Sequence, residues 1–149
     1  MAIARGAGTE IIRCHHFEAL NDTSRTLIYG VQHHIYTVLS VIVFGSSMQA
    51  VGNEVIMLVK GYDSLEGTTN ENNHIFRQGL NTNQTFVWND KFSFNGYEPV
   101  DFTGPMDDAT KQDAIADQGS SVAQYLSISA AHASDNVDVT ITFIDQNNA

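Results

Sequence analysis

Cysteine and proline are scarce in this chain of 149 residues, and each scarcity limits the kind of protein it can be. The single cysteine, Cys14, has no second cysteine to pair with, which excludes an intrachain disulfide framework. Two prolines occur, and no repeat or low-complexity block stands out. The apolar share of 42% is ordinary for a globular protein, and the length predicts one domain spanning residues 1–149.

Cations and long apolar runs are also few. Seven Lys and Arg residues stand against 17 Asp and Glu residues, a formal net charge of -10. Because nucleic acids and anionic membranes bind cationic surfaces, we expect neither as a partner. The longest apolar run, residues 38–44, is interrupted by Ser40 and falls well short of the roughly 18 residues of a transmembrane helix. Residues 1–13 contain no continuous apolar segment, so we expect no secretory signal and synthesis in the cytoplasm.

What the chain does contain is a series of short β-type patterns. Strands are expected at residues 9–17, 26–29, 33–44, 54–61, 74–79, 84–88, 91–94, 121–130 and 136–145. In the last of these, alternating apolar residues are expected to face the core: Val137, Val139, Ile141 and Phe143. Short connections predict antiparallel pairing. The expected fold class is all-β, an antiparallel β-sandwich or jelly-roll-like arrangement with one short surface helix.

Three segments are expected to lie outside the strands. Residues 62–73, rich in Asn, Thr and carboxylates, predict an exposed loop. Residues 105–118 predict the surface helix, with Pro105 in the first turn and Gly119 just past the end. Residues 1–8 predict either a strand or an N-terminal arm that reaches a neighbouring molecule.

The predicted strand at residues 33–44 is apolar on both faces. A two-layer sandwich covers only one face of each strand, so the other face needs a further partner. We therefore predict a homo-oligomer of closed cyclic symmetry. Its predicted subunit interface is the face that carries His34, Tyr36, Val38, Ile42 and Phe44.

Histidine pairs are the most site-like feature of the sequence. His15 and His16 follow Cys14, and His33 precedes His34. Adjacent strand residues point to opposite faces, so neither pair can chelate one ion, and no zinc-type spacing is present. We expect no metal and no cofactor, and place these histidines near a strand end or subunit contact. At a contact they would make assembly sensitive to pH between about 5 and 7, where imidazole gains charge.

Catalytic patterns are weak, and we expect no enzyme. The sequence FGSSM lacks the second glycine of a nucleophile elbow. The acidic residues of the predicted helix are typical of a solvated face: Asp107, Asp108, Asp113 and Asp117. A carbohydrate-binding module is a separate possibility, with stacking rings from Trp88, Tyr97 and Tyr62, although Trp88 alternates with Phe86 as a core residue would.

Four segments carry a resemblance to a known family. Taken in order they are GTEIIRCHHFEAL, LIYGVQHHIYTVLSVIVFG, FVWNDKFSFNG and VDVTITFIDQNNA. In this order they resemble small virion structural proteins of tailed bacteriophages, especially those of the marine cyanophage type. The resemblance is a pattern of strands without a catalytic motif, so it transfers no functional residue.

The resemblance implies a β-sandwich subunit that is built into a phage particle. We therefore expect a non-enzymatic virion structural protein, most specifically an oligomeric subunit that decorates or cements the capsid. A neck, tail or fibre component is the alternative within this class, and a carbohydrate-binding β-sandwich module is the alternative from another class. The expected partners are further copies of the chain and other virion proteins, such as the major capsid protein or neck and tail proteins.

Overall fold

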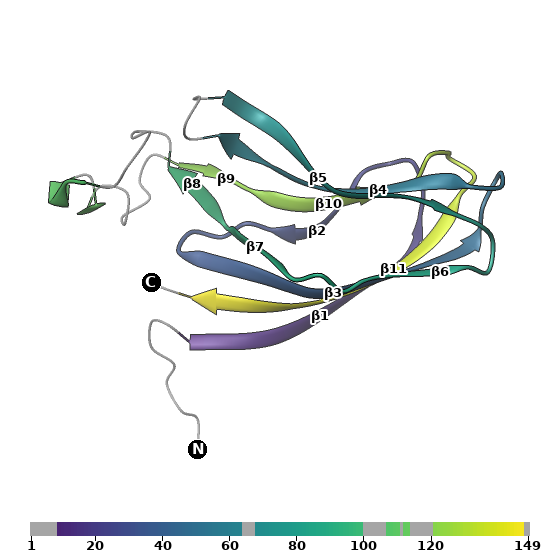
Figure 1. The fold of residues 1–149 in the computed structure, drawn as a ribbon, viewed down its shortest axis with the longest axis horizontal. Coiled ribbons are helices and arrows are strands. Elements are labelled where there is room, and N and C mark those ends of the chain that lie inside the picture. Colours follow the sequence, from purple (N-terminus) through teal and green to yellow (C-terminus); the bar gives the residue numbers. More distant parts are fainter. Residues whose placement is uncertain (1–8, 64–67, 100–106, 111, 114–120, 148–149) are drawn as a thin grey trace, which may run out of the picture.

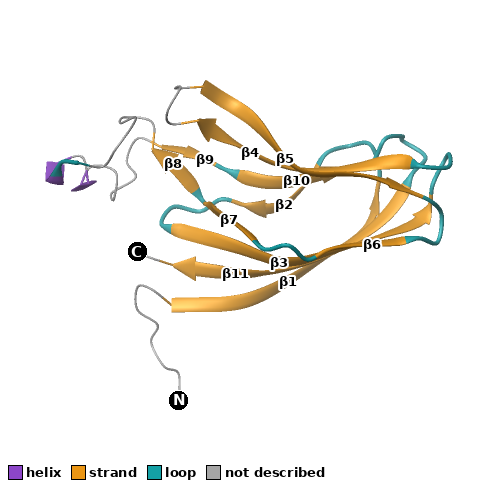
Figure 2. Ribbon diagram, in the orientation of Figure 1, coloured by secondary structure: helices purple, strands orange, loops and turns teal. Residues whose placement is uncertain are grey.

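The computed structural model describes residues 9–63, 68–99, 107–110, 112–113 and 121–147, and these residues are nearly all β (Figure 2). The strands are β1 (Thr9–Leu20), β2 (Arg25–Tyr29), β3 (His34–Ser47), β4 (Asn53–Asp63), β5 (Thr68–Leu80), β6 (Thr85–Trp88), β7 (Phe92–Asn95), β8 (Tyr97–Pro99), β9 (Ser121–Ala123), β10 (Tyr125–Ser129) and β11 (Asn136–Asn147). Within this part of the chain, no helix is long and apolar enough to cross a membrane.

The strands form two antiparallel sheets that pack face to face, which confirms the predicted all-β sandwich (Figure 1). Sheet A has the order β1-β11-β3-β6, and β7 also pairs with β3. Sheet B has the order β2-β10-β4-β5. The β8–β9 ribbon lies at the end where the two sheets spread apart, on the left of Figure 1.

The core lies between the two sheets. In β11 the predicted alternation is confirmed, because its four inward residues are all fully buried: Val137, Val139, Ile141 and Phe143. From sheet B, Val55 and Met57 of β4 and Leu126 of β10 meet them in one cluster. Each fully buried aliphatic or aromatic side chain contributes roughly 1.5–3 kcal/mol, so this cluster is a main source of the stability of the sandwich.

A bulge in β3 corrects the predicted interface. Phe143 of β11 pairs with Val38, but the preceding Thr142 pairs with Ser40, so Leu39 is an extra residue in β3. One inserted residue moves every later side chain to the opposite face. The strand therefore buries Val38 before the bulge and Val41 after it.

The predicted interface residues are consequently divided between the two faces of sheet A. Tyr36 and Val38 are buried in the core, so their placement on an open face was wrong. His34 lies on the same inner side, half-buried at the end of the sandwich. Ile42, which is 42% exposed, and the half-buried Phe44 lie on the outer face. For these two, contact with another subunit stays a prediction.

The predicted loop at residues 62–73 is wrong where the structure describes it. β4 continues to Asp63 and β5 begins at Thr68, and these two residues pair in one hairpin. Strand pairing satisfies the backbone whatever the side chains are, and the described side chains of residues 68–73 are exposed, so polar residues are tolerated there. Residues 64–67 lie outside the described residues.

Little of the predicted helix and arm falls within the described residues. Residues 109–110 and 112–113 have helical backbone, and the Gln112 amide donates to the Asp108 carbonyl at 3.0 Å. The rest of 105–118 lies outside the described residues, as does the predicted arm at 1–8.

A glycine-lined crossing joins the sheets at the spread end. The Gly30 amide donates to the Gln124 carbonyl, and the Gln124 amide donates to the Gly96 carbonyl, each at 2.8 Å. A Cβ on Gly96 would lie 2.0 Å from the carbonyl oxygen of Val31, and one on Gly30 would lie 2.1 Å from the carbonyl oxygen of Gly96. Both positions therefore exclude any side chain.

Candidate interaction surface

Strand β1 forms a long edge of sheet A. Among the described residues it pairs only with β11, and from Thr9 to Phe17 each residue has its partner without a shift. The first irregularity follows Phe17, where Ala19 takes a positive φ of 57°. Ile12 is 72% exposed and Ile11 is 40% exposed on this strand. A regular edge with exposed aliphatic residues is a template for pairing with another strand.

Strand β2, an edge of sheet B, lies on the same side of the sandwich as β1. The ring Nδ1 of His15 in β1 donates to the carbonyl of Leu27 in β2 at 3.0 Å. The guanidinium of Arg25 in β2 lies over the ring of Phe17 in β1, 5.5 Å from its centroid. We call this side of the molecule the β1–β2 flank.

A buried carboxylate lies on the inner face of sheet A, at the spread end of this flank. Asp145 of β11 accepts from Nδ1 of His34 at 2.5 Å and lies 3.5 Å from the guanidinium of Arg13. The Tyr36 ring stacks on His34, and its hydroxyl donates to the Tyr29 carbonyl at 3.3 Å. Burial, with the Asp145 charge as a second cause, raises the pKa of Tyr36 to about 12, so its hydroxyl stays protonated at neutral pH.

Two cavities meet at this cluster. The larger, about 310 Å³, lies between β2 and the inner face of sheet A and is bordered by Arg13, His34 and Asp145. The smaller, about 230 Å³, shares His34 and Asp145 and extends to Ile11. A histidine held by a carboxylate is part of a hydrolase triad; the described lining of the larger cavity adds no serine, threonine or cysteine, and that of the smaller cavity adds Thr9. The absence of enzyme activity stays a prediction.

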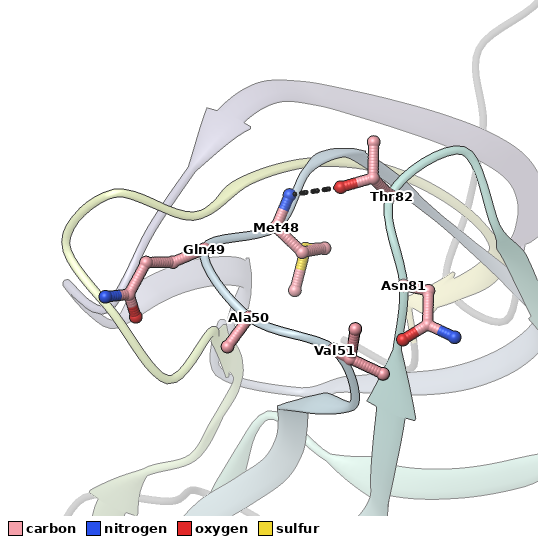
Figure 3. A pocket seen from close by; sticks show the side chains of 6 residues that line it. All are labelled: Met48, Gln49, Ala50, Val51, Asn81 and Thr82. Carbon is pink, nitrogen blue, oxygen red and sulfur yellow. Dashed lines mark hydrogen bonds between the residues drawn. The ribbon is translucent and has the colours of Figure 1, made fainter.

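The opposite end of the sandwich has a different cavity, of about 470 Å³, between the β3–β4 and β5–β6 turns (Figure 3). The Met48 amide donates to the Thr82 hydroxyl at 2.9 Å, as Figure 3 shows. Val51 at its rim is 91% exposed. The lining has no charged group among the described residues, so the hollow offers only neutral and apolar contacts.

Next to this hollow, a second buried carboxylate fastens the turns. Asp135 accepts from the Gln49 amide at 2.8 Å, the Asn53 side chain at 3.0 Å and the His132 amide at 3.0 Å. Burial by itself would raise the pKa of Asp135, but these hydrogen bonds, together with the nearby His132 ring, hold it below the usual value of 3.8.

The structure places the predicted histidines as separate groups. His15 points inward toward Phe143, while His16 points outward and bonds the Thr140 hydroxyl at 2.8 Å, so the two are on opposite faces as predicted. His33 occupies the turn before β3 with a φ of 64°. No cluster of three metal-ligating side chains occurs among the residues described. That the chain binds no metal stays a prediction.

The rings proposed for sugar stacking do not form a common surface in the described structure. Trp88 stacks on the buried Phe76 at 6.0 Å between centroids and packs against the core. Tyr97 is half-buried in β8, and the side chain of Tyr62 lies outside the described residues. Three acidic residues of the predicted helix are exposed: Asp107, Asp108 and Asp113. The fourth, Asp117, lies outside the described residues.

Sequence reasoning named His34 but missed the groups that hold it. Arg13 and Asp145 are separated from it in sequence, and their meeting depends on the β1-β11-β3 strand order. The one available signal was a carboxylate in phase with the buried residues of β11. Asp145 continues the alternation that ends with Phe143, and an acidic residue at an inward position needs a partner.

Comparison with known proteins gives similarity in fold only at a low level. No protein-family model and no curated protein matches the chain. A chain from disulfide-linked pili, the endospore appendages of Bacillus, is 12% identical with a TM-score of 0.42, covering 100% of this chain and 97% of that one.

Chains of infectious bursal disease virus are similar at the same level. The T13 particle chain is 9% identical with a TM-score of 0.42, covering 99% of this chain and 37% of its own length. The Gx strain chain is 9% identical with a TM-score of 0.39, and the match covers 93% of this chain and 33% of the viral chain. This chain therefore spans about a third of the viral chains. These TM-scores are low, so neither the function nor the assembly of these proteins transfers to it.

Proposed function

We propose that this chain is a non-enzymatic structural subunit that works as a homo-oligomer within a virion, most specifically one that decorates or cements a phage capsid. The observation that carries the assembly role is exposed aliphatic surface on a sandwich whose core is already closed. On the outer face of sheet A, Ile42 pairs with Val87, which is 50% exposed. On the same face, Ile12 of β1 pairs with Ile144 of β11. We take the exposed aliphatic residues of these two pairs as surface for contact with another molecule.

The virion setting is supported by the resemblance of four segments to small phage structural proteins. The charge agrees with it, because a net charge of -10 suits a surface that faces water and opposes contact with packaged DNA. A neck, tail or fibre component is the alternative position in the particle. The carbohydrate-binding alternative is weakened because Trp88 packs against the core.

The mass of the purified chain in native buffer tests the assembly role. Light scattering after size exclusion, at micromolar concentration, is expected to give a multiple of 16.3 kDa. A single copy throughout that range would overturn the homo-oligomer. Position is tested by mild dissociation of virions purified from cells that make the chain. Retention on capsid shells supports decoration, retention on tails supports the alternative, and absence from particles overturns the virion role.

A further inference from the structure

We propose that two copies of this chain join edge to edge through β1, which pairs antiparallel with the β1 strand of a second copy across a two-fold axis perpendicular to the sheets. This inference rests on the proposed homo-oligomer and names its contact. Sheet A would then continue from one copy into the other, and the same axis would bring β2 beside its counterpart. A two-fold contact of this kind closes on itself and leaves neither β1 edge open.

The regularity of β1 is the first observation that supports this contact. Its nine successive pairs with β11, from Thr9 to Phe17, contain no bulge, and the segment contains no proline and no lysine. Bulges, prolines, lysines and inward-pointing charges are devices by which proteins block strand addition at an edge, and of these the segment has one inward-pointing charge, Arg13, which is paired with Asp145. The other described edges are short or irregular: β2 has five residues, and β6 and β7 have four each.

The long edge strand β5 supplies the contrast. Its pairing with β4 shifts register twice, after Met57 and after Gly61. Asn70 in β5 has a positive φ of 60°, and the described side chains from Thr68 to His74 are polar and exposed. β5 therefore has more features that oppose strand addition than β1 has.

The second supporting observation is that β1 has exposed aliphatic side chains on both of its faces. Ile11 lies on the inner side of sheet A, beside the smaller cavity, and Ile12 lies on the outer side. A strand added at the edge would cover part of both side chains at once, because its residues also alternate between the two faces. A partner that covers only the outer face would cover Ile12 alone.

Charge identifies the occupant as a second copy. β1 and β2 together carry two glutamates and two arginines, so the flank is neutral on a chain whose net charge is -10. Two acidic molecules can approach through a neutral flank without like-charge repulsion. The twelve residues of β1 extend over about 40 Å and the five of β2 over about 17 Å, so a flank about 10 Å wide at each sheet offers roughly 570 Å² per copy, or about 1,100 Å² in all, just above the roughly 1,000 Å² that a specific contact needs.

Four lysine substitutions test this contact in the full chain: Ile11→Lys, Ile12→Lys, Ile42→Lys and Val51→Lys. Edge pairing predicts that Ile11→Lys and Ile12→Lys each weaken the dimer at least tenfold, measured as dissociation constant by sedimentation. Ile42→Lys should change it less than twofold, and so should Val51→Lys, the matched control on an exposed turn. Circular dichroism and thermal melting establish that each variant folds.

The outcomes separate this inference from the proposed function. If Ile12→Lys and Ile42→Lys weaken the dimer and Ile11→Lys does not, the outer face is the interface, and the edge contact is overturned while the homo-oligomer stands. A wild-type chain that is monomeric overturns both. Amide hydrogen exchange gives a readout independent of substitution, because the alternate β1 amides that do not bond to β11 should become protected as concentration rises. Equal exchange of those amides at every dilution would overturn the contact.

Discussion

Two buried aspartates lie at opposite ends of β11, and the chain satisfies them in opposite ways. Asp135, just before the strand, accepts hydrogen bonds from neutral donors and fastens the β10–β11 turn to the β3–β4 turn. Asp145, near the end of the strand, is held by the side chains of His34 and Arg13 beside two cavities. Neutral donors close one end of the sandwich tightly. A charged cluster leaves the other end with groups that a neighbouring molecule can reach.

The largest effect is expected from breaking the charged end. Asp145→Ala should lower the free energy of unfolding by about 3 kcal/mol, because His34 and Arg13 lose their shared acceptor and His34 remains half-buried. Urea unfolding followed by tryptophan fluorescence measures it. The exposed Asp90→Asn is the control, with an expected change within about 0.5 kcal/mol. A change at Asp145 as small as that of the control would contradict the role given to this cluster.

Breaking the neutral end should cost somewhat less. Asp135→Asn keeps one acceptor oxygen but replaces the other with an NH₂ group, which cannot accept from the Gln49 or His132 amide on that side. We therefore expect the free energy of unfolding to fall by about 2 kcal/mol. The same urea titration measures this loss. Hydrogen exchange should show faster opening at the Gln49 and His132 amides and unchanged opening near Asp145. Uniform opening of both ends would mean that the two carboxylates are not independent.

The two ends of the sandwich should lose their contributions to stability at opposite extremes of pH. The pKa of Asp135 is lowered by folding, so its contribution is present above 3.8 and is lost as pH falls through the lower folded value. The pKa of Tyr36 is raised, so its contribution is present below 10.0 and is lost as pH rises toward about 12. The stability gap between wild type and Asp135→Asn should therefore narrow in acid. The gap for Tyr36→Phe should narrow in alkali, and the reverse pattern would contradict these directions.

The smallest effect is expected from Arg13. Its side chain is about half exposed, so Arg13→Gln should cost about 0.5 kcal/mol, as solvent screens the ion pair with Asp145. High salt should reduce even this difference in the urea titration. A loss as large as that for Asp145→Ala would show that Arg13, and not His34, is the main partner of the carboxylate.

The sequence predicted the sandwich because β11 and its neighbours alternate cleanly, and the buried residues of β11 are the ones expected. It failed on β3 because both faces of that strand are apolar. A bulge at Leu39 produces this pattern just as an interface would, and only pairing with β11 distinguishes them. The prediction of a loop failed at residues 68–73 because a strand whose side chains are exposed to solvent needs no alternation of apolar and polar residues.

The candidate surface was harder to predict for a topological reason. His34, Arg13 and Asp145 come from three strands that meet only in the order β1-β11-β3. The edge position of β1 is likewise a property of strand order, and no local pattern in residues 9–20 marks it. Predicting this surface would have required knowing which strands pair with one another, and the β propensities of the residues do not reveal that.

The crossing around Gln124 has a consequence for recognising distant relatives. Gly30 and Gly96 come from two separated segments, and a methyl group on either would collide with backbone atoms of Gly96, Gln124 or Val31. Chains that keep this crossing should therefore retain these two widely spaced glycines even after the aliphatic residues of the core have been exchanged. That spacing provides a compact fingerprint for ancestry where overall similarity has faded.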